Sequence, residues 1–553
     1  MPARLAIHHP PGRMGVRNNP FGMDVANFEL FRALAQHGGY EALHVLSHVE
    51  VGAGEIDVLR EGAARPPRLT IGSVLDQGAA QAAGVVLRGR PDLYDLAWLR
   101  RRSLGDRAFS LVGLIHTLAP PATRQTIGMA AVGPTQPWDA LICTSPAVQA
   151  QTTQMFDAWG DYLAERFAGK PGPRPMLPLV PLGVDLPRLS AAADRPDARA
   201  ALRARLGLGA DDVLAIWVGR LSYFEKAFPQ PMFRALEEAA QATGARVHFA
   251  MAGWFPEPEN RAMYEAAARA YAPSVPLHLL DGNDRALLDE VWAGADIFLS
   301  LVDNIQETFG ITPLEAMASG LPVVVSDWDG YRYTVRDGRD GFLIPTLGGP
   351  SPALGRALSG RHVMGLDSYQ TYVGSVAQYT AVNVPAAAAA LAELIRSPEL
   401  RRRMGASGRQ RVREAFDWPV VIGQLNALFD ELTQIRAAAP DVQSRHRDNP
   451  LKGEPFADFA GFATSVLHLD MRLIARPQAG PADLTRAASL ELDQVAAIWR
   501  ATPAECGQAL AAVVDGAGSV RAVLERFPVQ RRRAVELGLI WMMKLGILDW
   551  VGG

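Results

Sequence analysis

The stretch ETFGITPLEAMASGLPVVVSD, residues 307–327, decides the fold of this chain. Its Thr312, Pro313 and Glu315 predict a helix start, with threonine as the N-cap, proline at the first helical position and glutamate three residues after the cap. Gly320 ends this helix, and the Leu-Pro that follows prevents its continuation. The apolar run after the proline predicts a buried strand. A short helix leading into a buried strand is typical of a parallel α/β sheet.

Two glutamates, Glu307 and Glu315, stand eight residues apart in this stretch. Glu307 follows the apolar run at 296–302, which predicts a place at the carboxyl end of a strand, where open α/β sheets bind ligands. The free N–H groups of a helix start suit a phosphate, and Gly310 allows the backbone to approach one closely. Taken alone, the residues equally allow a capping role for Glu315 and a solvated loop position for Glu307.

Alternation of strands and helices occurs twice along the 553 residues, which are too many for a single hydrophobic core. The pattern predicts an α/β protein with two doubly wound, Rossmann-like domains that face each other across a cleft, followed by a mostly helical C-terminal extension. The predicted boundaries are 1–190 for the first domain, 191–418 for the second, 419–437 for a helix that crosses back to the first, 438–456 for a linker and 457–553 for a helical extension of unknown role.

Composition excludes several classes of protein. A net charge of -3 argues against a general nucleic-acid binder, and no nucleic-acid partner is expected. Cys143 and Cys506 lie far apart and lack the spacing of a zinc cluster or a disulfide framework. No apolar run reaches the roughly 18 residues of a membrane span, and the N-terminal run is too short for a signal peptide. We therefore expect a cytoplasmic protein.

Two segments do not fit the alternating pattern. Residues 347–385 are rich in glycine and lack periodicity, which indicates an insertion that could act as a flap. The last predicted helix, at 530–550, has a basic head and an apolar body. That helix either packs inward within a small helical domain or lies in a membrane interface, and the sequence leaves both interpretations open.

The opening stretch resembles the E-x(7)-E signature of retaining glycosyltransferases of family 4, which have the GT-B fold. WVGRLSYFEK at 217–226 is similar to the motif with which that family carries a diphosphate-binding arginine and lysine. LVPLGVD at 179–185 is similar to its interdomain segment, WDALICTS at 138–145 to one of its strands, and residues 397–418 to its closing helices. The resemblance covers roughly residues 1–437 and is strongest from 180 to 345.

The resemblance implies roles for residues in the second half of the chain. Arg220 and Lys226 would hold the donor diphosphate, Glu307 would bind the donor sugar from its reacting side, and Glu315 would bind the nucleotide ribose. The remaining donor-binding set is the loop and helix start formed by Phe309, Gly310, Ile311 and Thr312. Two departures stand out. The spacing from Arg220 to Lys226 is one residue longer than usual, with Ala227 in place of glycine, and the segment before Glu307 is about two residues longer.

In the first half the resemblance implies fewer roles. His116 ends the predicted strand GLIHT, where the family often has an active-site histidine, and Gly22 would face the phosphates at a helix start. The family's preceding glycine is Phe21 here. Asp327 and Asp329 resemble a metal-binding DxD motif, but they follow a strand end, and we interpret them as a turn. Tyr333 stands where the family has a glutamate.

These residues imply an enzyme that moves a sugar from a nucleotide diphosphate sugar to an acceptor hydroxyl with retention, and that needs no metal and no prosthetic group. Two alternatives remain: a starch- or sucrose-type synthase, and a non-catalytic scaffold that senses nucleotide sugar. The expected acceptor is a sugar, a lipid-linked molecule or a polysaccharide of the cell envelope. Arg13, Arg17 and the run of Arg100, Arg101 and Arg102 suggest peripheral contact with the inner face of a membrane, although a solvated helix face fits the run as well.

Overall fold

The computed structural model of the chain forms two compact units, residues 1–447 and 448–553. Arg13 and Arg17, which the sequence suggested for membrane contact, lie outside the residues that the structure describes. The described residues are 3–9, 21–170, 172–350, 352–440 and 446–551.

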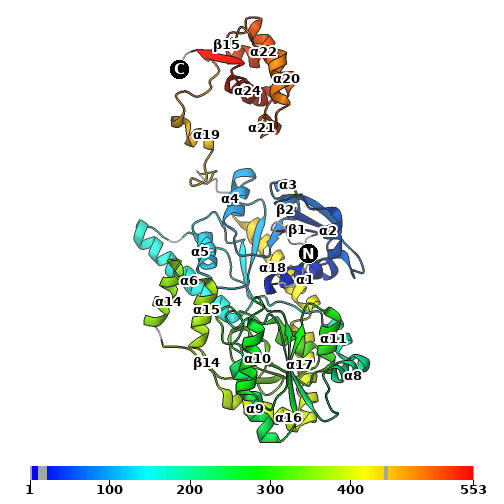
Figure 1. Cartoon of the computed structure of the whole chain (residues 1–553). Helices are drawn as coiled ribbons and strands as arrows, with labels where there is room; N and C mark the ends of the chain where they lie inside the picture. The colour runs from blue at the N-terminus through cyan, green and yellow to red at the C-terminus, as the bar shows by residue number, and fades with distance from the viewer. Residues whose placement is uncertain (1–2, 10–20, 171, 351, 441–445, 552–553) are drawn as a thin grey trace. The chain divides into compact units, whose positions relative to one another are not determined.

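The first half of the large unit is a six-stranded parallel sheet with the order β3-β2-β1-β4-β5-β6, drawn from blue to cyan in Figure 1. This is the strand order of a doubly wound fold. Strands are added on one side of β1 up to β3, and then on its other side from β4 onward, so the strand order reverses between β1 and β4. The sequence had indicated four of these strands and missed β3 and β4. The strands are β1 (Arg4–His9), β2 (Ala42–Ser47), β3 (Arg68–Ser73), β4 (Val85–Arg88), β5 (Ser110–Ile115) and β6 (Ala140–Cys143).

The second half repeats this topology in green, with the order β12-β11-β10-β7-β8-β9 (Figure 1). Its reversal point lies between β7 and β10. Two Rossmann-like sheets in series are the GT-B architecture, so the predicted fold class is confirmed. The strands are β7 (Val213–Val218), β8 (Val247–Gly253), β9 (Leu277–Asp281), β10 (Ile297–Ser300), β11 (Val323–Ser326) and β12 (Gly341–Ile344).

Helices surround both sheets and bury their apolar faces against them. Those of the first half are α1 (Gly22–His37), α2 (Ala53–Asp57), α3 (Gln77–Ala83), α4 (Tyr94–Ser103), α5 (Pro121–Gly128) and α6 (Pro146–Phe167). Those of the second half are α7 (Leu186–Ala193), α8 (Pro196–Arg205), α9 (Gln230–Thr243), α10 (Asn260–Tyr271), α11 (Arg285–Gly294), α12 (Ile311–Ala318), α13 (Asp329–Thr334), α16 (Val384–Arg396) and α17 (Pro398–Ala415).

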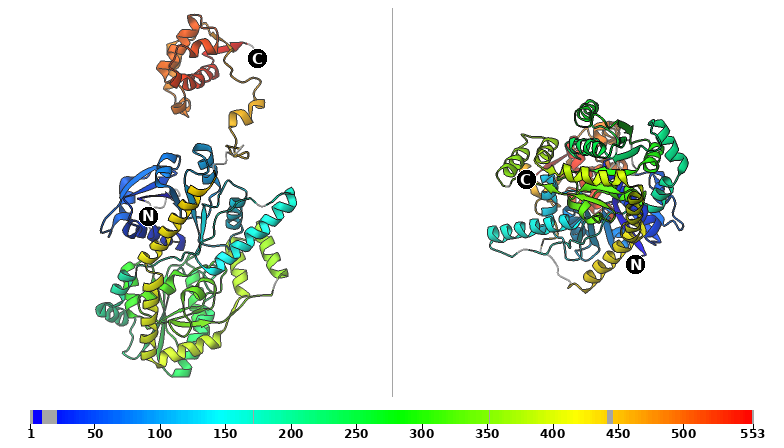
Figure 2. Two further views of the ribbon diagram at one scale, coloured as in Figure 1. Left: turned by 180° about the vertical axis from the view of Figure 1, so that it is seen from behind. Right: turned by 90° about the horizontal axis from the view of Figure 1, so that it is seen from below.

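A long helix, α18 (Trp418–Ala438), links the end of the second half to the first. Figure 2 shows it in yellow along the first half. Tyr40 donates a hydrogen bond to the Asn426 side chain, and Arg436 donates one to Ser110 at 2.7 Å. Both contacts are to the first half, and α18 follows directly on α17 of the second half, so α18 connects the two halves.

The segment interpreted as an irregular insertion is a pair of helices, α14 (Ala353–Val363) and α15 (Tyr369–Gln378). Two short antiparallel strands flank the pair, β13 (Thr346–Leu347) and β14 (Ala381–Val382). No described residue of α14 is buried, whereas α15 buries Val373, Gly374 and Ala377. The inner helix therefore holds the insertion on the protein, and the outer helix packs on it.

The predicted start of the decisive helix is wrong by two residues. Helix α12 begins at Ile311, and its N-cap is Gly310, with φ at 81° and no side-chain capping bond. Two observations require glycine at position 310. Its backbone is left-handed, and a Cβ atom there would lie 1.9 Å from the Tyr331 ring. Thr312 is therefore not the cap, and Glu315 closes no capping box. The predicted end at Gly320 and the strand β11 that follows are confirmed.

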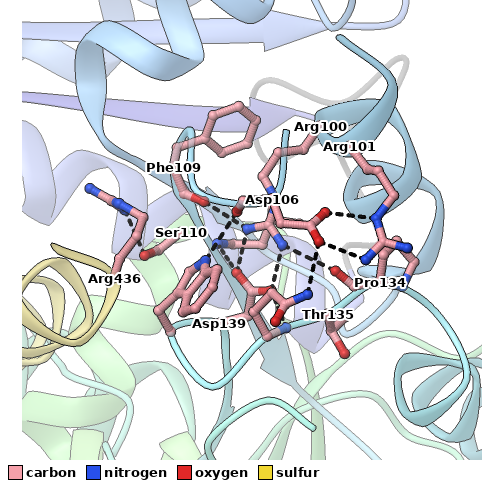
Figure 3. A network of polar contacts seen from close by, with 12 residues as sticks. Arg100, Arg101, Asp106, Phe109, Ser110, Pro134, Thr135, Asp139 and Arg436 are labelled. Carbon is pink, nitrogen blue, oxygen red and sulfur yellow. Dashed lines mark hydrogen bonds and ion pairs between the residues drawn. The ribbon is translucent and has the colours of Figure 1, made fainter. Parts of the chain in front are cut away.

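The predicted surface run of arginines is wrong for its first member. Arg100 of α4 is fully buried and forms a bidentate ion pair with Asp139, with N–O distances of 2.7 and 2.8 Å (Figure 3). Arg101 pairs with Asp106 at 2.6 Å. A helix turns 100° per residue, so consecutive arginines cannot share one face. Arg100 therefore cannot reach a lipid surface. None of the described helices is long and apolar enough to cross a membrane.

The small unit, 448–553, has its own hydrophobic core. Helix α24 contributes Val535, Leu539 and Met542 to it, which confirms that this helix packs inward. The helix ends at Lys544, and the residues predicted to complete it form a strand that pairs with another. The elements are α19 (Pro455–Asp458), β15 (Arg472–Ala475), α20 (Pro481–Ala488), α21 (Glu491–Gln494), α22 (Pro503–Val514), α23 (Val520–Leu524), α24 (Val529–Lys544) and β16 (Leu548–Val551).

Candidate functional site

The candidate site lies where the carboxyl ends of both sheets meet. Arg220 follows β7 and Glu307 follows β10, on either side of the reversal point of the second sheet. His116 follows β5 of the first sheet, and its backbone oxygen accepts a hydrogen bond from the Thr308 hydroxyl at 2.6 Å. This bond joins the two halves of the unit one residue from Glu307. Doubly wound sheets bind ligands at such a point.

Lys226 and Glu307 form an ion pair across the second half, with 3.3 Å between the ammonium nitrogen and the carboxylate oxygen. The two residues are 81 positions apart in the chain. Both side chains keep some exposure, 29% for the lysine and 15% for the glutamate. The pair therefore places a cation and a hydroxyl-accepting carboxylate side by side at the edge of the sheet, where each can still contact a ligand.

Arg220 pairs with Glu225, a residue that the sequence had not singled out. Its guanidinium also lies over two rings, 5.1 Å from the centre of Phe21 and 5.9 Å from that of Trp254. Phe21 precedes α1 in the first half, so the side chain that replaces the family glycine contacts the expected phosphate-binding arginine. Glu225 is immediately before Lys226 in the chain, a position that could have drawn attention to it.

The two segments that depart from the expected spacing contact each other. The Phe224 oxygen, in the loop after Arg220, accepts a hydrogen bond from the Asn304 side chain at 2.5 Å. Asp303 accepts one from the Phe228 backbone nitrogen at 3.3 Å. Burial raises the pKa of Asp303 well above its usual range. These contacts hold the loop that carries Lys226 against the segment that precedes Glu307.

The start of α12 lies beside this pair. Gly22, predicted to face the phosphates from the first half, begins α1, and a Cβ atom there would meet open space. In α12 the N–H groups of the first turn have no partners within the helix, and the Thr312 hydroxyl contacts that of Tyr331. The Phe309 nitrogen lies 3.5 Å from a Glu307 oxygen. This first turn is therefore a set of donors next to the Lys226–Glu307 pair.

Glu315 is half-buried on α12, and among the described residues its side chain has no hydrogen bond or ion pair. Burial raises its pKa to about 6, against the opposing charge of Arg188. A carboxylate that loses water without gaining a protein partner is costly to keep. Its unused acceptor oxygens are thus available to a ligand with hydroxyl groups.

His116 is held in its neutral form. Its Nε2 atom lies 3.0 Å from the Asn27 side-chain oxygen and 3.1 Å from the Gly89 oxygen, so Nε2 carries the proton and donates. Burial lowers the pKa of His116 to about 4. The other ring nitrogen, Nδ1, is consequently a hydrogen-bond acceptor at neutral pH.

Asp327 and Asp329 lie in different environments. Asp327 pairs with Arg332 at 2.6 Å in the turn after β11, as interpreted from the sequence. Asp329 instead faces the first half, where the Ser145 hydroxyl donates to it at 2.6 Å. Burial, together with the charge of Glu307, raises its pKa to about 7. This contact could not be predicted from local sequence pattern, because Ser145 is 184 residues from Asp329.

Three further features concern metal binding, the missing glutamate and the cysteines. Among the described residues no group of three or more histidine, cysteine, aspartate or glutamate side chains could hold a metal ion. Tyr333, in place of the family glutamate, packs its ring on Phe416, 6.0 Å between centres. Both cysteines are buried and unpaired.

Comparison with known proteins finds a family model and several curated relatives that are similar to this chain. Residues 198–347 match the family model described as "Glycosyl transferases group 1". A phosphatidyl-myo-inositol mannosyltransferase of Mycobacterium leprae is 35% identical over 124 residues, 22% of this chain and 24% of the relative. A D-inositol 3-phosphate glycosyltransferase of Geodermatophilus obscurus is 29% identical over 266 residues, 47% of this chain and 48% of the relative. The chain thus spans less than half the length of these curated relatives.

Two solved structures are also similar to this chain, at lower identity. A sucrose-phosphate synthase of Thermosynechococcus elongatus has a TM-score of 0.46 and 18% identity, over 79% of this chain and 100% of that one. HepE of Anabaena, in complex with UDP and glucose, has a TM-score of 0.46 and 15% identity, over 78% and 100%. The matched family model spans Lys226, Glu307 and the start of α12. The chain therefore carries, at residues 198–347, a glycosyl transferases group 1 domain.

Proposed function

We propose that this protein transfers a sugar from a nucleotide diphosphate sugar to an acceptor hydroxyl, with retention at the anomeric carbon and without a metal ion. The observation that carries the proposal is the Lys226–Glu307 ion pair beside the first turn of α12, within the matched family segment. The pair and the helix start together offer one cation, one carboxylate and several N–H donors to one ligand. A diphosphate joined to a sugar has complementary groups.

The reaction needs stabilisation of a leaving diphosphate. The bond between the anomeric carbon and a phosphate oxygen breaks, and the diphosphate keeps the electron pair. The acceptor oxygen forms the new bond on the same face and gives its proton to the departing diphosphate. Fixed cations and N–H donors aimed at the developing charge speed such a step. In our proposal Lys226, Arg220 and the start of α12 supply them, and Arg220 exchanges part of its contact with Glu225 for the phosphate.

The two glutamates would hold opposite ends of the donor. Glu307, next to the lysine, accepts hydrogen bonds from the sugar hydroxyls, and Glu315, further along α12, accepts them from the ribose. Glu315 has no partner among the described protein residues, which supports a ligand contact over a structural one. His116 adds a neutral acceptor, Nδ1, from the first half.

For the acceptor we propose a lipid-linked or polysaccharide molecule of the cell envelope. The support is the name of one relative, a phosphatidyl-myo-inositol mannosyltransferase, and it comes from a match over a quarter of that protein. Since Arg100 is buried in an ion pair, contact with a membrane has no support from that residue.

A panel of nucleotide diphosphate sugars tests the function. We expect one donor to raise the melting temperature and to release its nucleoside diphosphate; a ligand at a hundred times its Kd adds about 2.7 kcal/mol of stability. Glu307→Gln should lower turnover far more than donor affinity, and Glu315→Gln should mainly weaken nucleotide binding. The matched control is Glu265→Gln, at a part-exposed glutamate that pairs with Arg261 on its own helix. No nucleotide release from any donor would refute the proposal.

A further inference from the structure

A cavity of about 470 Å³ has Glu307 in its lining. Its walls include α5 and α6 of the first half, the segment that carries Glu307, the turn around Asp329 and the inserted helix α15, which contributes Tyr372. The cavity thus joins Glu307 to a helix outside the residues that match the family model, which end at 347.

Helix α15 is fixed to the segments that carry the donor machinery. The Tyr369 hydroxyl donates to the Gln306 side chain at 2.7 Å, one residue before Glu307. Gln370 donates to Glu225, the partner of Arg220, at 3.4 Å. At Gly374 a Cβ atom would lie 2.4 Å from the Phe224 ring, so the helix packs closely on the loop between Arg220 and Lys226. Helix α15 of the insertion therefore contacts the segments that carry Arg220, Lys226 and Glu307.

Tyr372 is held in place as part of the cavity wall. The His362 ring of α14 stacks on it with 5.1 Å between centres and 4° between planes. His362 is in turn fixed by the Asp367 backbone oxygen, 3.0 Å from its Nδ1 atom. Burial raises the pKa of Tyr372, and the charge of Arg124 opposes that rise, so the phenol and the guanidinium are neighbours. The phenol is thus a fixed donor at neutral pH.

The charges that line the cavity are paired, with one exception. Glu307 pairs with Lys226, Asp329 accepts from Ser145, and Arg332 pairs with Asp327. Arg124 of α5 is exposed, and in the part of the chain that the structure describes its side chain has no hydrogen bond or ion pair. An unpaired guanidinium beside a fixed phenol suits the oxygens of an anion.

We propose that Arg124 and Tyr372 form an acceptor subsite for an anionic group, a phosphate or a carboxylate, on a molecule whose hydroxyl is presented beside Glu307. The proposal rests on the proposed function, because the cavity becomes an acceptor site only if the donor lies at α12. The insertion then determines which acceptor binds. It supplies the Tyr372 phenol and the His362 ring that stacks on it. It is also hydrogen-bonded to Gln306, next to Glu307, and to Glu225, the partner of Arg220.

Probe binding with the donor site filled tests this inference. The protein is saturated with the nucleoside diphosphate that stabilises it most, and glucose, glucose 6-phosphate and glucuronic acid are titrated by calorimetry. Arg124→Ala should weaken binding of the anionic probes by ten- to a hundredfold, the range for loss of a charge-assisted hydrogen bond. Tyr372→Phe should weaken it several-fold. Arg356→Ala, an exposed arginine of α14 that does not line the cavity, should leave it unchanged.

The outcomes separate the two proposals. Binding of the phosphate or carboxylate probe that Arg124→Ala weakens and Arg356→Ala does not supports the subsite and identifies the anion it takes. Equal affinity of all three probes, or equal loss in both arginine variants, overturns it. A wild-type protein that releases no nucleotide from any donor instead refutes the proposed function, and with it the acceptor assignment.

Discussion

Arg100 and Arg220 are both arginines paired with a carboxylate, and their surroundings differ in one respect. Arg100 is enclosed on every side: Asp139 accepts two hydrogen bonds from it, and the Phe109 and Pro134 oxygens accept two more. Asp139 also accepts from the backbone, including Leu111 at 2.8 Å. Arg220 keeps 10% of its side chain exposed and touches aromatic faces instead of further acceptors.

The difference separates a charge that holds the fold from one that can bind a ligand. The Arg100–Asp139 pair is fully buried, so no ligand can reach it, although the Nε atom of Arg100 has no hydrogen-bond partner. Removing one member of such a pair leaves the other charge buried and unpaired. Arg220 has one carboxylate partner and keeps some exposure, so its unused N–H donors can still contact a ligand. Exposure, more than charge or hydrogen-bonding capacity, therefore distinguishes Arg220 from Arg100.

The largest effect is expected from breaking the enclosed pair. Arg100→Met should lower the free energy of unfolding by about 3–5 kcal/mol, because Asp139 is left buried without its cation. Urea denaturation followed by far-UV circular dichroism measures it. Arg101→Ala, on the same helix and paired with the part-exposed Asp106, should cost about 1 kcal/mol or less. Equal losses for the two variants would contradict the structural role of Arg100.

The reverse pattern is expected for Arg220. Arg220→Met should lower nucleotide release from the donor by about 10²–10³-fold, the usual loss for one group that stabilises a transition-state charge. Its cost in unfolding free energy should be smaller than that of Arg100→Met, because Glu225 keeps contacts with Ser222 and Gln370. Steady-state kinetics and urea denaturation on the same preparations check both parts. If the Arg220→Met variant is destabilised but fully active, Arg220 has a structural role like that of Arg100.

The sequence could not distinguish these two arginines by local pattern alone. Three consecutive arginines predicted a basic surface, whereas the partner of the first is 39 residues away, immediately before β6. The motif around Arg220 was recognisable because its spacing is local, and the structure does place Lys226 against Glu307. Contacts that depend on which strands become neighbours, such as that between Ser145 and Asp329, leave no trace in local spacing.

The fold was easier to predict than the site's details. Strong apolar runs predicted five of the six strands of the second sheet and missed β12. In the first sheet the two missed strands are β4, which has only four residues, and β3, which begins with arginine and contains a glycine. The start of α12 was misplaced because a threonine-proline pair has the pattern of a cap, and Gly310 took that position through a left-handed backbone packed on Tyr331. The two helices of the insertion have little apolar periodicity, since α14 buries nothing.

A smaller effect on stability is expected for Glu315→Gln, and it is opposite in sign to that of the arginine variants. Because its pKa is raised from 4.5 to about 6, the folded protein binds this proton more tightly than the unfolded chain does. The carboxyl thus favours folding below about pH 4.5 and loses that contribution as the pH rises through 6. Glu315→Gln should therefore be more stable than the wild type by roughly 1–2 kcal/mol above pH 7, and equal to it near pH 4.

At saturating nucleoside diphosphate above pH 7, the wild type should become more stable than Glu315→Gln. The wild-type carboxylate then gains ribose hydroxyls as partners, whereas the amide of the variant binds them less well. Thermal melting at pH 4, 6 and 8, with and without nucleotide, gives both comparisons. If the variant is less stable at every pH and nucleotide stabilises both proteins equally, Glu315 is a structural residue of α12.

The smallest effect is expected from removing metal. In our proposal the diphosphate charge is met by Lys226, Arg220 and the N–H groups of α12, so EDTA should leave nucleotide release unchanged. Asp327 is already paired with Arg332, and the double variant Asp327→Ala and Asp329→Ala should keep that insensitivity to EDTA, whatever its rate. Activity measured after EDTA treatment, and again after adding manganese, decides the point. Recovery of lost activity by manganese would mean that a cation shares the task assigned to Lys226 and Arg220.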